Sequence, residues 1–154
     1  MDGMKAMNPA DPDFERRVRD SFERQSFMKT IGATLERVDP GAVDIRLPVH
    51  SGLTQQHGFV HAGAVASIAD SACGYAAFSL MPPDSGVLAV EFKINLMSPA
   101  AGDCLIARGR VIRAGRTLTV CQADVVAVRD GNEKTVAMLT ATVMTVTGRA
   151  DVQG

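Results

Sequence analysis

Apolar and polar residues alternate with great regularity between residues 87 and 97. The apolar positions are Leu88, Val90, Phe92, Ile94 and Leu96, and the polar residues Glu91, Lys93 and Asn95 lie between them. A period of two is typical of a strand that buries one face and leaves the other in solvent. We therefore predict a half-buried strand over residues 87–97, with the five apolar side chains on one face.

Five other stretches have the composition of strands bounded by turns. They are residues 30–37, 42–49, 104–112, 117–128 and 135–147. Their connections are Asp39-Pro40-Gly41, Arg113-Ala114-Gly115-Arg116 and Asp130-Gly131-Asn132, which are rich in turn residues. Connections this short favour antiparallel neighbours, because parallel strands need long crossovers. The pattern predicts an antiparallel sheet of five to six strands.

Two segments have a helical pattern instead. Residues 13–28 are mostly polar, and Phe14, Val18 and Phe22 form a narrow apolar stripe at four-residue spacing. A longer helix is predicted over residues 62–80, ending before Pro82-Pro83, which cannot continue it. One long helix must cover one face of the sheet, so the order of elements predicts an α+β fold.

The long helix carries small or polar residues along one face. These residues are Gly63, Ala66, Ser67, Asp70, Cys73, Gly74 and Ala77. Small side chains let a neighbouring backbone or a thin ligand approach, so this face predicts either tight packing on the sheet or a substrate channel or subunit contact beside Asp70. The segment has the length of a membrane span, but its central Asp70 and its Ala and Gly content favour a soluble, buried helix.

Composition and charge change this picture little. A chain of 154 residues suits one domain, and a net charge of −1 gives no argument for binding nucleic acid or an anionic membrane. Cys73, Cys104 and Cys121 have no metal-binding spacing, so we expect buried free thiols in a reducing compartment and no metal site. Residues 1–17 do not resemble a signal peptide, and we place the protein in the cytoplasm.

The residues that carry chemistry lie where a glycine-containing loop enters the long helix. The first N–H groups of a helix have no intrahelical acceptor, so they can hold an anion or a developing oxyanion. Asp70 lies two turns further along, in mostly apolar surroundings where a carboxylate needs a partner or a function. From the residues alone, Asp70 could equally bond a neighbouring loop, His61 could only fix the loop, and Gln55 could be a surface residue.

The stretch HGFVHAGAVASIADSACGYAA, residues 57–77, resembles the signature of the hotdog-fold thioesterases. It is most similar to their phenylacetate-pathway (PaaI-like) branch, which has G-x-x-H-G-G and an Asp nine residues after the His. Here the pattern is Gly58-x-x-His61-Ala62-Gly63 with Asp70. The stretch AVEFKINLMSPA and the last two hairpins resemble later strands of that family, so the resemblance covers residues 32–147.

This resemblance implies a hotdog fold, in which the sheet wraps around the long central helix, and an acyl-CoA thioesterase activity. With the helical pattern before it, we expect a tail and short helix over residues 1–28, a thioesterase domain over residues 29–148 and a flexible end over residues 149–154. Asp70 would be general base or nucleophile, and the backbone N–H of Ala62 would form the oxyanion hole. Gln55 would orient the thioester or the water, and His61 would brace the loop.

Further residues are implied to contact substrate. They are Gly63, Ser67, Gly74, Ala89, Arg113 and Arg116, the two arginines being near the nucleotide of CoA. Three positions depart from the family. Ala62 replaces a Gly, Ala89 stands where some members have Ser or Thr, and Gly74 stands where a related branch has a hydroxyl residue.

The resemblance also implies a homo-oligomer, a dimer or a tetramer of two dimers, in which the loop and Asp70 of one site come from different subunits. No cofactor is required for the hydrolysis. Three alternatives remain: a non-catalytic acyl-CoA binder or sensor, a hotdog dehydratase or hydratase, and a purely structural oligomer. The acyl group is left open between aryl-acetyl, medium-chain and hydroxylated substrates.

Overall fold

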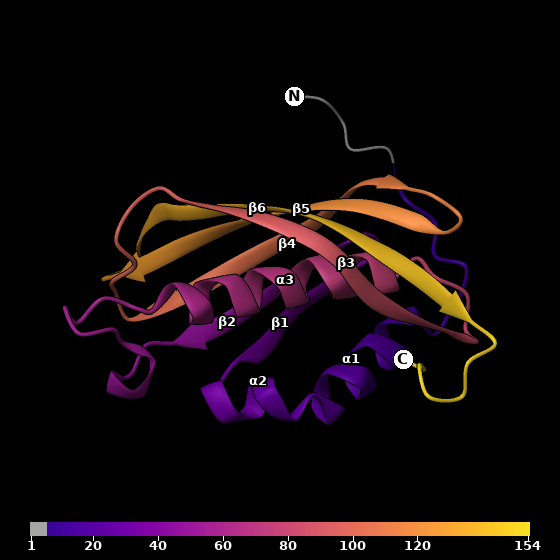
Figure 1. Cartoon of the computed structure of the whole chain (residues 1–154), viewed down its shortest axis with the longest axis horizontal. Helices are drawn as coiled ribbons and strands as arrows, with labels where there is room; N and C mark the ends of the chain where they lie inside the picture. Colours follow the sequence, from indigo (N-terminus) through magenta and orange to yellow (C-terminus); the bar gives the residue numbers. More distant parts are fainter. Residues whose placement is uncertain (1–5) are drawn as a thin grey trace.

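The computed structural model describes residues 6–154 and shows one antiparallel sheet lying against one long helix, α3 (Figure 1). The sheet has six strands in the order β1-β2-β4-β5-β6-β3. The strands are β1 (Thr34–Asp39), β2 (Ala42–Pro48), β3 (Ser85–Leu96), β4 (Cys104–Ala114), β5 (Leu118–Arg129) and β6 (Asn132–Thr147). Helix α3 spans Ala62–Phe78 and packs on five of these strands, so the predicted α+β layer is confirmed.

Small residues allow α3 to lie very close to the sheet. Ile68, Ala69 and Ala72 of the helix are fully buried. At Gly109 in β4, an added Cβ atom would lie 2.4 Å from the carbonyl carbon of Ala72. The helix backbone therefore rests on a strand backbone at this point, which only glycine allows. On the partly exposed side of α3 the predicted small-residue face is confirmed around Asp70, but Cys73 and Ala77 belong to the buried side.

The N-terminal helical prediction is confirmed, with a break. Helix α1 (Phe14–Arg24) and helix α2 (Ser26–Ile31) meet at Gln25, and the predicted stripe places Val18 and Phe22 in the main apolar core. The strand predicted to begin at residue 30 is wrong at its start, because residues 30 and 31 still belong to α2. Gly32 ends that helix with a left-handed φ of +84°, a conformation suited to glycine.

The regular alternation over residues 87–97 forms a strand as predicted, but its faces differ from the prediction. Ala89 pairs with Val143 and Glu91 with Thr142, so Val90 is an extra residue in a β-bulge. The bulge shifts the alternation by one. Leu88 therefore lies on the opposite face from Phe92, and the five apolar side chains do not share one face.

Strand β3 is also far more exposed than a half-buried strand. In the part of the chain that the structure describes, it forms one edge of the sheet and pairs only with β6. Val90 is 55%, Phe92 45% and Leu96 55% exposed, although all three are apolar. The chain thus presents a long strand edge whose polar backbone groups and apolar side chains both lack cover in a single copy.

The structure also bears on the cysteines and on the possibility of a membrane-spanning helix. Cys73, Cys104 and Cys121 are buried free thiols, as predicted. Within residues 6–154, no helix combines the length and the apolar character needed to cross a membrane.

Candidate active site

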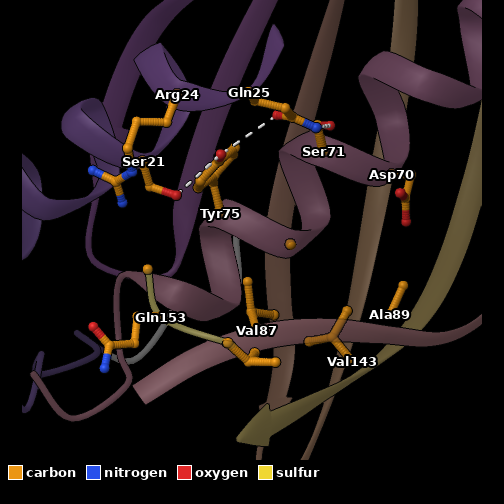
Figure 2. Close-up of a pocket in the computed structure, with 13 residues that line it drawn as sticks. Ser21, Arg24, Gln25, Asp70, Ser71, Tyr75, Val87, Ala89, Val143 and Gln153 are labelled. Atoms are coloured by element: carbon orange, nitrogen blue, oxygen red, sulfur yellow. Dashed lines mark hydrogen bonds between the residues drawn. The ribbon is translucent and has the colours of Figure 1, made fainter. Parts of the chain in front are cut away.

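Asp70 lies near the middle of α3 and lines a cavity of about 360 Å³ (Figure 2). The carboxylate is partly buried, and across residues 6–154 no side chain or backbone group donates a hydrogen bond to it. Burial raises the pKa of Asp70 above the ordinary value of an aspartate. Gly74 and Ala89 line the same cavity, so two of the predicted substrate-contacting residues do lie beside Asp70.

One wall of this cavity is polar and was not anticipated from the sequence. The Tyr75 hydroxyl donates to Gln25 Oε1 at 3.4 Å and lies 3.3 Å from Ser21 Oγ, while Gln25 Nε2 donates to Ser71 Oγ at 3.2 Å. Burial is the largest cause that raises the pKa of Tyr75, so the phenol stays protonated at neutral pH. Tyr75 is the one tyrosine of the sequence, which is a signal that could have drawn attention to it.

The cavity is closed by segments that lie far apart in the sequence. Ser21 and Arg24 come from the end of α1 and Gln25 follows it. Val87, Ala89 and Val143 form an apolar wall on β3 and β6. Residues 152–154 complete the lining, and the Gly154 N–H donates to the Ser85 carbonyl at 3.3 Å. The C-terminal segment therefore reaches the region of α1, as Figure 1 shows.

The N-terminus of α3 has a defined set of donors. The Gly63 N–H donates to His61 Nδ1 at 2.8 Å, which makes His61 the N-cap of the helix. The N–H groups of Ala64 and Val65 both donate to the His61 carbonyl. Ala62 keeps a backbone N–H without an acceptor in the part of the chain that the structure describes. One donor is thus left for a ligand at this terminus.

Ala62, His61 and Gln55 line a second cavity of about 500 Å³. Gln55 Oε1 accepts the His57 N–H, so the amide nitrogen of Gln55 is the end that can donate to a ligand. Phe59, Leu96 and others give this cavity apolar walls. It is therefore suited to a ligand that is largely apolar and has one acceptor group.

One chain does not bring the predicted catalytic residues together. Asp70 lines the first cavity, whereas Gln55, His61 and Ala62 line the second. The two cavities meet opposite ends of the exposed strand β3, through Ala89 in the first and Leu96 in the second. A second copy that covers β3 could therefore complete both.

The other predicted substrate contacts, Gly63, Ser67, Arg113 and Arg116, line neither cavity. The hydroxyl of Ser67 donates to the Gly63 carbonyl at 2.6 Å, so these two polar groups bond each other inside the helix. Arg113 and Arg116 lie at the exposed β4–β5 hairpin and line neither cavity.

Two buried thiols and His50 are poor candidates for catalysis. Burial raises the pKa of the Cys73 thiol strongly and that of Cys121 to about 12, so neither is a thiolate at neutral pH. His50 bonds the Ile31 carbonyl at 3.2 Å, which ties it to the end of α2. Between residues 6 and 154, no group of three His, Cys, Asp or Glu side chains has the arrangement of a metal site.

Comparison with known proteins places this geometry in context. The family model described as "Thioesterase superfamily" matches residues 57–134, which include the end of the loop, α3 and strands β3, β4 and β5. A protein of Halobacterium salinarum that carries the provisional name of an esterase is 30% identical over 118 residues, covering 73% of this chain and 78% of that protein.

Solved structures of thioesterase-family proteins have the same fold as this chain. A thioesterase family protein from Silicibacter pomeroyi is 50% identical, with a TM-score of 0.86 over 88% of this chain and 99% of that one. The PaaI protein of the E. coli phenylacetic acid degradation operon is 24% identical, with a TM-score of 0.78 over 88% of this chain and 95% of that one. At that identity the second likeness concerns the fold alone, and it confirms the predicted hotdog architecture.

Proposed function

Because the chain belongs to the thioesterase superfamily, we propose that it hydrolyses acyl-CoA thioesters to a free acid and CoA. The observation that carries the proposal is Asp70, a partly buried carboxylate that lines a cavity without a hydrogen-bond donor among the described residues. A carboxylate in such surroundings is unfavourable for folding, and groups of this kind cluster at functional sites.

The hydrolysis can be written with the groups of this chain. Asp70 acts either as a base that takes a proton from water, whose oxygen then adds to the thioester carbonyl, or as the nucleophile itself through a mixed anhydride. The free N–H of Ala62 stabilises the oxyanion that forms on the carbonyl oxygen. The C–S bond then breaks, and the CoA sulfur leaves as a thiolate, which takes up the proton that Asp70 removed from water. On the nucleophilic route, water then hydrolyses the mixed anhydride to the free acid and the Asp70 carboxylate, and the proton released goes to the thiolate. Gln55 orients the thioester or the water, and His61 holds the helix terminus in place.

The active form in this proposal is a homo-oligomer with composite sites. Asp70 and the loop at Gln55–Ala62 line different cavities of one chain, and both cavities adjoin the exposed strand β3. Pairing of β3 with the β3 of a second copy would cover the strand edge and bring Asp70 of one subunit toward Ala62 of the other. Three free thiols support a reducing compartment such as the cytoplasm.

Release of free thiol from a panel of aromatic and aliphatic acyl-CoAs tests the proposal. Wild type should hydrolyse at least one member, and Asp70→Asn should lower kcat/KM by about 10² or more, the usual contribution of a positioned general base. The pH profile gives a second readout. Asp70 must be ionised to act, so activity should fall as the pH drops, with a midpoint above the ordinary aspartate pKa of about 3.9 because burial raises the pKa of Asp70.

The control is the stability of the same variant. A raised carboxyl pKa means that the ionised form destabilises the folded chain, and this effect is present above that pKa and absent below the ordinary value of about 3.9. Asp70→Asn should therefore be at least as stable as wild type at pH 7, with the difference shrinking in acid. If both proteins bind acyl-CoA and neither releases thiol, the protein is a binder and the proposal is wrong.

A further inference from the structure

The cavity that contains Asp70 has a second charged residue, a cation. Among the side chains that line it, Asp70 carries the one negative charge and Arg24, the last residue of α1, carries the one positive charge. Figure 2 shows Asp70 and Ala89 on one side of the view and Arg24 and Gln153 on the other, with Tyr75 between them. The cavity therefore has a negative side, where we place the reaction, and a positive side away from it.

Arg24 differs from the other arginines of α1 because it has no acidic partner. The other three form ion pairs, namely Arg16 with Asp13, Arg17 with Asp11 and Arg19 with Glu15. Across residues 6–154, no carboxylate lies within 4.0 Å of Arg24, not even that of Asp20 one turn earlier. An unpaired guanidinium suits a carboxylate, to which it can donate two parallel hydrogen bonds.

The polar wall fixes the backbone next to Arg24. Gln25, the next residue, bonds both Tyr75 and Ser71 of α3, so the junction between α1 and α2 is fixed against the helix that carries Asp70. Arg24 is also close enough to Tyr75 for its charge to lower the pKa of the phenol, against the larger effect of burial. The backbone position of Arg24 relative to α3 is thus set by contacts between helices.

We propose that this cavity binds the acyl part of the thioester and that this acyl group ends in a carboxylate held by Arg24. The substrate would be the CoA half-thioester of a short dicarboxylic acid. The inference rests on the proposed function, because it assumes that the thioester carbon lies at Asp70. A cavity of about 360 Å³ is near the lower end of the ~300–1,000 Å³ usual for small-molecule sites, which suits an acyl group rather than a whole acyl-CoA.

Charge also limits the length of the acyl chain. A carboxylate close to Asp70 would meet a like charge, whereas one carried on a chain long enough to reach Arg24 would meet an opposite charge. The apolar wall formed by Val87, Ala89 and Val143 suits the methylene groups between the two ends. A phosphate of CoA is the other anion that Arg24 could bind, and the experiment separates the two sources.

The experiment compares thioesters of equal chain length that end in a carboxylate or in a methyl group: glutaryl with pentanoyl, adipoyl with hexanoyl and suberoyl with octanoyl CoA. In wild type, kcat/KM should favour the carboxylate member of at least one pair by about tenfold, the effect of one modest charge-assisted hydrogen bond. Arg24→Gln should bring this ratio to about one. Arg16→Gln, which removes a cation of the same helix that does not line the cavity, should leave the ratio as in wild type.

Two results would overturn the inference alone. Equal kcat/KM for both members of every pair in wild type would show that no carboxylate is recognised. An equal loss for both members in Arg24→Gln would show that Arg24 binds the CoA part that all substrates share. If wild type hydrolyses no thioester of either kind, the proposed function fails and the inference fails with it.

Discussion

At the scale of single residues, the position of Ala62 allows one hydrogen-bond donor to be removed while its helix is kept. Ala62 is the first residue of α3 after the His61 cap, and its N–H is the one left free at this terminus within residues 6–154. Proline is well tolerated at this position because its missing N–H has no intrahelical acceptor there. His61 already has φ −60° and ψ 138°, which suit a residue before proline.

We therefore predict that Ala62→Pro folds normally and lowers kcat by about 10²–10³, the usual effect of losing one oxyanion donor. Steady-state thiol release and thermal unfolding measure the two properties. Ala62→Gly is the matched control, because it changes the side chain and keeps the N–H, and it should retain activity. Wild-type activity in Ala62→Pro would mean that this N–H does not contact the reacting carbonyl.

At the scale of elements, two glycines on either side of the helix–sheet contact should respond in opposite ways to a methyl group. An added Cβ at Gly109 meets the Ala72 backbone at 2.4 Å, whereas one at Gly74 in α3 meets nothing within 4 Å. Gly109→Ala should lower the free energy of unfolding by at least the ~1–3 kcal/mol typical of overpacking. Gly74→Ala should raise it by up to about 1 kcal/mol, because alanine favours helix.

Gly74→Ala should also change activity, because Gly74 lines the cavity beside Asp70. The methyl group narrows the space for the acyl chain, so kcat/KM should fall more for branched or aromatic acyl groups than for straight ones. Urea unfolding and substrate profiles on the same preparations check both effects. A Gly74→Ala variant that is destabilised would indicate that this side of α3 lies against a partner that leaves no room.

The elements were predictable wherever local sequence determines them. The order of elements and the α+β layer followed from three local features: the alternation of apolar and polar residues in the strands, the turn residues between them and the prolines after α3. The faces of β3 were not predictable, because the bulge at Val90 is defined by pairing with β6, some 50 residues later in the chain. The start of β1 was predicted too early because Thr30 and Ile31 are β-branched, which favours a strand, whereas in the structure they end α2 and Ile31 is buried there.

The residues of the candidate site also fall into two groups, those that a local motif could indicate and those that only tertiary packing brings together. Asp70, Ala62 and His61 lie within ten residues of one another, so a local motif could indicate them. The polar wall of Gln25, Ser71 and Tyr75, and the cation Arg24, come together only through the packing of α1 on α3 and of the C-terminal segment near both. No spacing rule connects residues 24 and 75, so this half of the cavity could not be predicted from the sequence and was found only in the structure.

At the scale of the whole molecule, the exposed edge of β3 and the separation of Asp70 from Ala62 both suggest that a second subunit is needed. Strand β3 has twelve residues and, within residues 6–154, no neighbour on its outer side, with Val90, Phe92 and Leu96 largely exposed. A long apolar strand edge in a natural protein is normally covered. In a two-fold dimer formed through β3, each site would take Asp70 from one subunit and Ala62 from the other.

This arrangement predicts that two inactive variants restore activity when they share a dimer. A mixed dimer of Asp70→Asn and Ala62→Pro has one site with both changes and one site with neither. Equal amounts, unfolded and refolded together, should recover about a quarter of wild-type activity, because random pairing makes half the dimers mixed and each mixed dimer has one intact site of two. The variants refolded separately and then combined in the assay provide the control for subunit exchange. If Asp70 and Ala62 acted within one chain, every site of the mixed dimer would carry one change and co-refolding would restore nothing.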